Sequence, residues 1–520
     1  MTDYVIIGAG SAGCVLADRL SASHSVVLLE AGGSDRAMEV AIPAAFSKLF
    51  KTERDWDFST DPEPGADDRS LYLPRGKMLG GSSSMNAMLY IRGRPSDYDG
   101  WAEAGAVGWD WASVLPVFTE MEANSRGADE FHGESGQVLV DDLRVVNPLS
   151  RAFVAAAMQA GIAANADFNG AVQEGTGFFQ VTQRRGRRWS AADAFLRPAM
   201  SRPTLEVVTD ALVTRVLIEG GRATGVEYVK EGRTELVSAR AEVVVAAGAY
   251  GSPQLLQLSG IGDPEHLRRI GIEPVVESRS VGENLQDHPV TMVMYDTPFE
   301  GSLDDADSLP ELARWLVGRR GRLTSPGAEA CAFVRSGPDV DEPDLQFHFG
   351  PVCFSEHGMS DFAGHAYTFG PVLVSPRSRG HVQTRSADPT LPPAILTNSL
   401  SDPADLEALV SGLELAREIG AQSAFDPYRG TELSPGPDVS TRDELIAYVR
   451  QRLELLYHPA GTCRMGSDDG AVVDPRLKVR GVDGLRVVDA SVMPTVVSGN
   501  TNASTMMIAA RGAELILADA

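Results

Sequence analysis

The stretch DYVIIGAGSAGCVLADRLSASHSVVLLEAG, residues 3–32, decides the fold of this chain. The apolar run at 4–7 reads as a buried parallel strand, and the apolar residues within 15–20 recur at helical spacing. A second apolar run at 26–29 ends at Glu30. The order of strand, glycine turn, helix, strand and acid predicts an α/β domain of the Rossmann type.

Three glycines in this stretch, Gly8, Gly10 and Gly13, have the spacing G-x-G-x-x-G. Gly8 permits the tight turn, Gly10 lets a pyrophosphate approach the backbone, and Gly13 lets the helix pack closely on the strand. The phosphates would lie at the helix N-terminus, where free N–H groups and the helix dipole favour anions. Glu30 is placed to accept hydrogen bonds from a ribose hydroxyl and would repel a 2′-phosphate. The motif therefore predicts FAD or NAD, and not NADP.

Length and composition limit the classes of protein that the chain can belong to. Its 520 residues are enough for two or more domains of about 100–200 residues each. It is 43% hydrophobic and 22% charged, which is ordinary for a globular protein. The formal net charge of −25 argues against a nucleic-acid surface, which needs clustered Lys and Arg, and against docking on anionic lipid.

Cysteine usage and the N-terminus predict where the protein works. The four cysteines lie far apart and form no CxxC pair, which is typical of reduced thiols: Cys14, Cys331, Cys353 and Cys463. The first residues, MTDYVIIGAG, have no basic segment followed by a signal-like apolar segment. No apolar run approaches the roughly 20 residues of a membrane helix. We therefore expect a cytoplasmic protein without a membrane span.

Two further stretches contain glycine turns. GKMLGGSSSMNAMLYIRGRPSDYDGW, residues 76–101, includes a turn rich in hydrogen-bond donors that can lie against a flat cofactor or a phosphate. GAYGSPQLLQLSGIG, residues 248–262, follows the apolar run AEVVVAAG and reads as a second strand–turn–helix unit. Each stretch taken alone is also compatible with an ordinary loop or βα unit.

The stretch LLYHPAGTCRMG, residues 455–466, raises three possibilities for His458. A zinc site needs three or four ligands at a recognisable spacing, and His458 has no CxxC or HxxxH partner, so no metal is predicted. A Cys/His nucleophilic pair needs Cys463 in an electropositive environment, which the adjacent Arg464 could supply. The third possibility is a proton acceptor for a reaction whose other components come from elsewhere in the chain.

The stretches at 76–101 and 248–262 together resemble the two signature patterns of the glucose–methanol–choline (GMC) oxidoreductases. The stretch at 455–466 and GLRVVDASVMPTVVSGNTNASTMMIAARGAE, residues 484–514, are similar to the C-terminal active-site and flavin-contact segments of that family. The resemblance extends from residue 3 to about 515 and is weakest between about 295 and 440. Within the family the chain looks closest to bacterial choline dehydrogenase-like and hydroxymethylfurfural oxidase-like members.

The resemblance implies a two-domain layout of the α/β class, α+β overall. A Rossmann-like FAD-binding domain would combine residues 1–148, 188–292 and 455–520. A substrate-binding domain, with an antiparallel sheet flanked by helices, would combine residues 149–187 and 293–454.

The resemblance also implies roles for individual residues. His458 would be the catalytic base, a role that suits imidazole because its pKa lies near the working pH. Asn502 would be its partner and would donate a hydrogen bond to the substrate oxygen. Met85 stands where some family members attach FAD to a histidine, so we expect non-covalent FAD. The residues expected to contact FAD are Gly8, Gly10, Ser11, Ala12, Gly13, Glu30, Ala31, Gly81, Ser82, Asn86, Ala87, Met88, Leu89, Val213, Asp489, Ala490 and Ala503.

The activity that follows from the resemblance is oxidation of a primary alcohol to an aldehyde. The hydroxyl proton would pass to His458 and a hydride to flavin N5, and the electrons would then pass to oxygen or to a quinone or other redox carrier. Two alternatives remain: a non-redox hydroxynitrile lyase-like enzyme on the same fold, and an NAD-dependent dehydrogenase that uses the first glycine motif alone.

Three other residues have interpretations of their own. His288, in VGENLQDHP, is interpreted as structural, and Cys463 as a packing residue. His348 lies on an alternating run, DLQFHFGPVCF, that predicts a strand. Either face of that strand could line a pocket, and a core position is favoured for His348.

Overall fold

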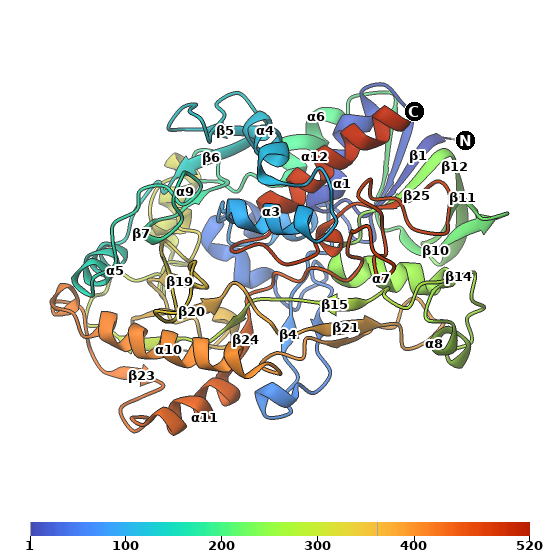
Figure 1. The fold of residues 1–520 in the computed structure, drawn as a ribbon. Helices are drawn as coiled ribbons and strands as arrows, with labels where there is room; N and C mark the ends of the chain where they lie inside the picture. Colours follow the sequence, from blue (N-terminus) through green and yellow to red (C-terminus); the bar gives the residue numbers. More distant parts are fainter. Residues whose placement is uncertain (1, 361) are drawn as a thin grey trace.

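A parallel sheet forms around the first strand of the chain (Figure 1). The structure is a computed structural model and describes residues 2–360 and 362–520. β1 (Thr2–Ile7) lies between β2 (Val26–Leu29) and β12 (Arg233–Val245) and is parallel to both. β9 (Leu205–Val208) extends the sheet beyond β2, and β25 (Leu485–Val487) extends it beyond β12. The Rossmann-type prediction is confirmed.

The turn after β1 is shaped by two of its glycines. Gly8 has a φ of +95°, a left-handed conformation that glycine adopts readily. A Cβ on Gly13 would overlap the Gly8 carbonyl oxygen, so α1 (Ser11–Ser21) can approach the strand only because position 13 has no side chain. α1 packs against α12 (Asn502–Asp519), which brings the two ends of the chain together.

β12 belongs to two layers. Its first half pairs with β11 (Arg222–Lys230), which pairs with β10 (Leu212–Glu219), and both pairings are antiparallel. Its second half pairs with β1 in the parallel sheet. α7 (Gly248–Leu258) then begins three residues after the strand ends, as the strand–turn–helix reading of this region predicts.

The second large sheet is antiparallel and has the order β23-β17-β20-β19-β18-β7; β16 pairs with β20, and β24 pairs with β16. Phe347 and Phe349 of β19 point into a core that also contains Phe153 of α5 and Phe369 of β20. α5 and α10 pack against its strands, which confirms the antiparallel sheet flanked by helices. The domain boundaries stay a prediction. The elements are β7 (Gly175–Phe178), β16 (Pro289–Val290), β17 (Val293–Asp296), β18 (Ala330–Val334), β19 (Leu345–Gly350), β20 (Ala366–Leu373), β23 (Glu432–Ser434), β24 (Glu454–Leu455), α5 (Pro148–Gln159), α10 (Pro403–Gly420) and α11 (Arg442–Arg452).

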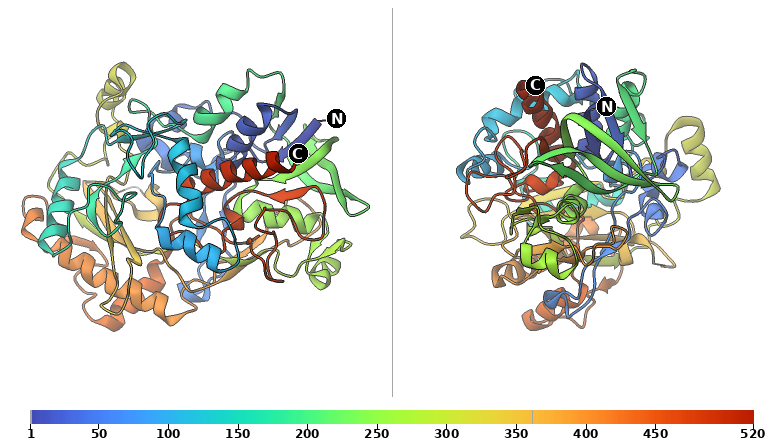
Figure 2. Two further views of the ribbon diagram at one scale, coloured as in Figure 1. Left: turned by 45° about the horizontal axis from the view of Figure 1, so that its top comes forward. Right: turned by 90° about the vertical axis from the view of Figure 1, so that its right-hand side faces the viewer.

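One helix, α9 (Leu309–Gly318), stands out from the body of the molecule in both views of Figure 2. None of the helices in the described ranges is long and apolar enough to cross a membrane. Other elements are α2 (Met38–Ala41), α3 (Pro95–Glu103), α4 (Trp111–Met121), α6 (Arg197–Ala199), α8 (Pro264–Arg269), β3 (Phe58–Ser59), β4 (Tyr72–Leu73), β5 (Glu122–Asn124), β6 (Val138–Asp142), β8 (Gln180–Val181), β13 (Ile261–Gly262), β14 (Val276–Glu277), β15 (Glu283–Leu285), β21 (Gly380–Gln383) and β22 (Ala394–Leu396).

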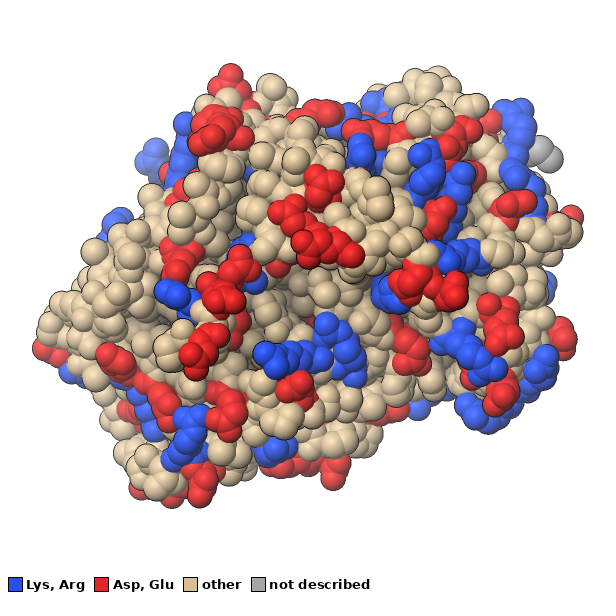
Figure 3. All heavy atoms as spheres, in the orientation of Figure 1, with Lys and Arg blue, Asp and Glu red and all other residues tan. Residues whose placement is uncertain are grey.

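Charged side chains of both signs are interspersed over the face shown in Figure 3. The net charge of −25 is therefore an excess spread over a mixed surface on this side, and it does not describe the charge of any particular patch.

Candidate functional site

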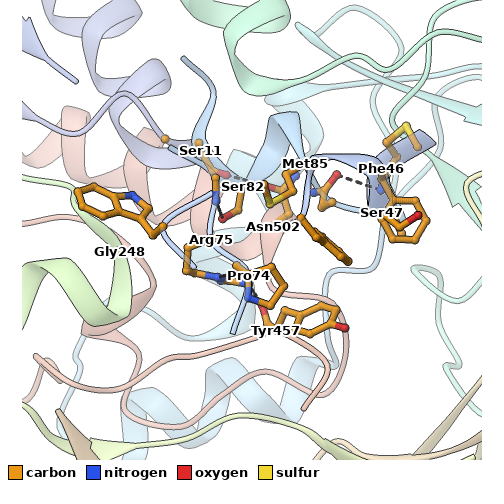
Figure 4. Close-up of a pocket in the computed structure, with 18 of the residues that line it drawn as sticks. Ser11, Phe46, Ser47, Pro74, Arg75, Ser82, Met85, Gly248, Tyr457 and Asn502 are labelled. Atoms are coloured by element: carbon orange, nitrogen blue, oxygen red, sulfur yellow. Dashed lines mark hydrogen bonds between the residues drawn. The ribbon is translucent and has the colours of Figure 1, made fainter. Parts of the chain in front are cut away.

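A cavity of about 940 Å³ brings most of the predicted site residues together. Of the nineteen that the sequence analysis names, all except Gly13 and Ala503 line it. Figure 4 shows part of this cavity, with Ser11, Ser82 and Asn502 gathered near its centre and Arg75 and Tyr457 beside them. Gly13 is hidden between α1 and β1, and Ala503 is buried on α12.

One end of the cavity is built from backbone. The N-termini of α1 and α12 both reach it, and neither has a hydrogen bond from the side chain of its N-cap residue, Gly10 or Thr501. The first N–H groups of a helix have no partner within the helix, and together with the helix dipole they favour an anion. This end is suited to a phosphate-containing cofactor.

The glycines at this end leave space for such a group. A Cβ built on Gly10 meets no atom within 4 Å, so this residue borders open space. A Cβ on Gly81 would lie 2.7 Å from the Gly10 Cα, so the second glycine turn packs directly on the first. Gly248, at the start of α7, also borders open space. The three glycines fit the pyrophosphate of a dinucleotide such as FAD.

Two carboxylates brace this end of the cavity. The oxygens of Glu30 accept hydrogen bonds from the backbone N–H groups of Ala9 and Gly32, each at 2.8 Å. Burial raises the pKa of Glu30 to about 7, although these two hydrogen bonds act in the opposite direction. Asp489 accepts hydrogen bonds from the N–H of Gly248 and the hydroxyl of Ser252, and therefore caps α7. Contacts of Glu30 and Asp489 with a cofactor stay predictions.

His458 lies at the other end of the cavity, in a row of hydrogen-bonded side chains. Its Nε2 lies 3.2 Å from Nδ2 of Asn500, and Oδ1 of Asn500 accepts from Gln346 at 3.3 Å. Its Nδ1 lies 3.0 Å from Nδ1 of His288. Because the Asn500 oxygen already accepts from Gln346, its amide nitrogen donates to His458 Nε2. The neutral His458 then carries its proton on Nδ1 and donates it to His288.

Of the two asparagines near the start of α12, the one beside the His458 ring is Asn500, while the role predicted for Asn502 stays a prediction. The side-chain oxygen of Asn502 accepts a hydrogen bond from the Ser11 hydroxyl at 2.7 Å, which ties the start of α12 to the start of α1. Asn500, two residues earlier, is the amide beside His458. The segment SGNTNAST offers both asparagines, and the choice depends on where α12 begins. Sequence patterns locate a helix start only to within one or two residues.

His288, interpreted as structural from the sequence, contacts the ring of His458 directly. It is fully buried, and burial lowers its pKa to about 3. Its Nε2 is turned toward the carbonyl groups of Val374 and Val497 without forming a well-aligned hydrogen bond. No sequence signal pointed to this position, because the contact of its neighbour Asp287 with the backbone of His458 forms only in the folded protein.

Asp287 holds the backbones of both histidines. One oxygen of its buried carboxylate accepts the N–H of His288 and the N–H of His458, each at 2.7 Å. Burial raises the pKa of Asp287 to about 7, and the nearby Arg75 acts in the opposite direction. Since a single atom fixes both loops, the separation of the two imidazole rings is set by the backbone and not only by their own contact.

The two faces of β19 have different surroundings, and only the face that carries His348 lines the cavity. His348 and Gly350 line the cavity, Gln346 holds Asn500, and the phenylalanines of the same strand face the core. The core position favoured for His348 is therefore corrected. Its Nε2 is buried without a hydrogen-bond partner, and burial lowers its pKa to about 3.

These neighbours determine the charge of His458. Its pKa lies well below the ordinary value, first because of burial and then because of nearby His288, His348 and Arg75. The imidazole is therefore neutral at physiological pH and can accept a proton. Cys463 does not take part, because it is fully buried in the core and burial raises its pKa well above the ordinary value. Among the described residues, no group of three or more His, Cys, Asp and Glu is placed to bind a metal ion.

The outer part of the cavity is mostly apolar, and two of the acids in the cavity lining, Asp304 and Asp307, have partners. The two oxygens of Asp304 accept hydrogen bonds from the N–H groups of Cys353 and Ala366 and from the Ser302 hydroxyl. Asp307 forms an ion pair with Lys48 at 3.2 Å. The apolar residues here are Ile42, Ala45, Phe46, Leu303, Ala306, Leu312, Leu323, Val352, Phe354, Met359 and Phe362.

Comparison with known proteins identifies matches over the whole chain. Models of the GMC oxidoreductase family match residues 2–290 and 376–509. The chain is 45% identical to "Alcohol dehydrogenase [acceptor]" of Pseudomonas putida, over 99% of this chain and 96% of that protein. It is 44% identical to "Oxygen-dependent choline dehydrogenase" of Sinorhizobium medicae, over 99% and 95%. Pyridoxine 4-oxidase from Mesorbium loti superimposes with a TM-score of 0.90 and 32% identity, over 99% of each chain.

Proposed function

This chain belongs to the GMC oxidoreductase family, whose members are FAD-dependent enzymes acting on CH–OH groups, and we propose that it oxidises an uncharged primary alcohol to the aldehyde with His458 as the base. The observation that carries this proposal is the row Gln346–Asn500–His458–His288 at one end of the cavity whose other end is suited to a dinucleotide.

His458 and Asn500 both act on the hydroxyl group of the substrate, one as proton acceptor and the other as hydrogen-bond donor. Nε2 of His458 is unprotonated in the network; when the alcohol binds, its hydroxyl replaces the Asn500 N–H at this nitrogen, and Nε2 accepts the hydroxyl proton. The amide N–H of Asn500 donates a hydrogen bond to the same oxygen and orients it. Because Gln346 fixes the other end of the Asn500 amide, the donor cannot rotate away from the substrate.

His288 acts through His458 and does not touch the substrate. By accepting the Nδ1 proton of His458, it keeps Nε2 free as the proton acceptor. We therefore assign His288 as a positioning residue, with Asp287 holding both histidines by their backbones.

Bound FAD would accept the hydride that leaves the carbinol carbon at its N5 atom. The N-termini of α1 and α12, the three glycine turns and Glu30 would hold it. Met85 lines the cavity where a covalent link would form, and a thioether cannot make that link, so binding is non-covalent. The electrons pass on to oxygen or to another acceptor such as a quinone.

The charges in the cavity favour an uncharged substrate. Arg75 lies close enough to lower the pKa of His458, and its side chain donates to the carbonyl groups of Pro74 and Tyr457 and not to a carboxylate. A permanent cation there repels a quaternary ammonium group. Asp304 and Asp307, in the outer part, already have partners. An apolar alcohol meets no such penalty.

The test is reduction of the flavin by alcohols without oxygen. The purified protein should be yellow, and aliphatic or aromatic primary alcohols should bleach it faster than choline does. If the flavin stays oxidised with every alcohol while the protein cleaves a hydroxynitrile, the lyase-like alternative is correct. If no FAD is bound or can be bound, the whole proposal fails. Comparing peroxide yield with reduction of a quinone or dye identifies the acceptor.

A further inference from the structure

α9 exposes apolar side chains on the face where a surface helix normally carries polar ones. Glu311 and Trp315 face inward and are buried. The outward face carries Leu309, Leu316 and Val317, which are 81%, 51% and 92% exposed. An ordinary amphipathic helix on a globular protein has the opposite arrangement. In both views of Figure 2 α9 lies at the edge of the molecule, and the exposed fractions show that the stripe is accessible to a partner.

Arginines surround the apolar stripe. The indole N–H of Trp315 donates to the carbonyl of Gly186, so α9 rests on the loop QRRGRR at 183–188. Apart from the buried Arg188, that loop and the segments next to it contribute six arginines, of which all but the half-buried Arg319 are exposed: Arg144, Arg184, Arg185, Arg187, Arg319 and Arg320.

These six arginines have no partners of opposite charge. Within residues 2–360 and 362–520, none of them forms an ion pair with an acidic side chain. Other arginines nearby are neutralised, because Arg314 pairs with Glu311 and Arg322 pairs with Asp305. The area around α9 is therefore a local positive patch on a protein with a net charge of −25.

We propose that α9 and the arginines around it form a docking surface for an anionic lipid bilayer. Apolar side chains on the outer stripe of a helix, with arginines beside them, match the pattern of helices that lie in the membrane interface. The net charge of the whole protein does not prevent this, since electrostatic interactions are screened beyond about 8 Å at physiological ionic strength. At contact the bilayer meets the arginines, and the expectation drawn from net charge alone does not hold for this patch.

The docking surface lies beside the outer part of the cavity. Leu312, on the same helix, lines the cavity one turn from Leu309 and Leu316. The cavity lining also includes the exposed residues Lys48 and Asp307. A docked protein would therefore hold this part of its cavity close to the lipid, from which an apolar alcohol can enter. This last consequence rests on the proposed function, whereas docking itself does not.

The experiment is flotation of the FAD-loaded protein with lipid vesicles. Vesicles containing phosphatidylglycerol should carry the protein upward, vesicles of phosphatidylcholine alone should not, and added salt should reduce binding. Replacing Arg184, Arg185 and Arg187 with Gln should weaken binding roughly fivefold per arginine, or on the order of 100-fold together. Leu316→Ser with Val317→Ser should weaken it by at least about tenfold, since the change removes the inserted apolar surface.

A matched control lies in the hairpin between β11 and β12, on the opposite side of Figure 1. Leu236 is also exposed there, at 65%, and Arg233 is an exposed arginine near it. Arg233→Gln with Leu236→Ser should leave flotation unchanged. Circular dichroism and flavin content check that each variant is folded.

Insertion has a separate readout. In a Leu316→Trp variant, the emission of the new indole should be quenched by brominated lipid chains in anionic vesicles. The proposal is overturned if the protein does not float with anionic vesicles, if it floats equally with neutral ones, or if the α9 variants bind as the original does. Binding only to an acidic protein would overturn it as well. None of these outcomes depends on turnover, so they are distinguishable from failure of the proposed oxidation.

Discussion

The two ends of the cavity manage charge in opposite ways. Around Gly10 and Ser11, positive potential comes from helix N-termini, which keep their polarity at any pH. Around His458, the three titratable rings of His288, His348 and His458 are held neutral, because burial lowers all three pKa values. Binding an anion needs a charge that does not titrate, whereas accepting a proton needs a group that begins without one. The comparison can be tested at each end separately.

The largest change in the rate of flavin reduction is expected from a substitution at His458. His458→Ala should lower the rate of flavin reduction by alcohol about 10²–10⁴-fold, because no other group replaces its Nε2. FAD content should be unchanged, since the flavin end is built from other residues. Stopped-flow measurement of flavin reduction under nitrogen gives the rate. His266→Asn is the matched control, because that buried histidine on α8 bonds the Thr384 carbonyl and does not line the cavity.

The next effect separates the two asparagines. Asn500→Ala should slow flavin reduction roughly 10–100-fold, because a hydrogen bond to a developing negative charge is lost. Asn502→Ala should leave this rate almost unchanged and lower the free energy of unfolding by about 1 kcal/mol, because the bond to Ser11 is lost. If flavin reduction is slow in Asn502→Ala and fast in Asn500→Ala, the partner of His458 is Asn502, as the sequence predicts. Single-turnover kinetics and denaturant unfolding measure the two quantities.

A smaller effect, on the affinity for FAD, is expected from a substitution at Gly10, at the opposite end of the cavity. Gly10→Ala places a Cβ in open space, so the apoprotein should be as stable as before. The methyl group would stand where the pyrophosphate passes, and FAD affinity should fall roughly tenfold or more, which is about 1.4 kcal/mol. Fluorescence titration of the apoprotein with FAD measures this. Gly100→Ala, which also meets no neighbouring atom, should leave FAD affinity unchanged.

The smallest effect concerns the neutral state of the histidines. The pKa of His348 is about 3 in the folded protein and about 6.5 when unfolded, so the unfolded chain binds the proton more tightly. The contribution of neutral His348 to the free energy of unfolding is fully present above pH 6.5 and is lost as the pH falls toward 3. Relative to His348→Gln, the original protein should lose about 1 kcal/mol of unfolding free energy between pH 6 and pH 5. Equal slopes in urea titrations of the two proteins at these pH values would show that His348 is not held neutral.

The geometry of the end where we propose that FAD binds could be predicted from sequence because its components are local. Gly8, Gly10 and Gly13 act through backbone geometry within one strand–turn–helix unit, and Glu30 follows at the end of the next strand. The position of each residue depends on its neighbours in the chain, so a pattern of spacing contains the necessary information.

The other end could be predicted only in part, because it is assembled by packing. Gln346, His288, His458 and Asn500 come from four separate segments, and no spacing rule relates them. His458 was found through its family motif, whereas its two contacts were missed. The positive patch around α9 could not be predicted either. Net charge is a sum over the whole chain, and the arginines of the patch come together only in the folded protein.

The hydrogen bond between Ser11 and Asn502 joins residues that are 491 positions apart. It has a consequence for synthesis on the ribosome. The first strand and the glycine turn emerge early, but the helix that completes their site is translated last. While the C-terminal residues are still in the exit tunnel, the nascent chain has only half of the flavin end. If FAD binds where we propose, we expect its uptake to follow release of the finished chain, and a protein truncated before α12 should not retain flavin.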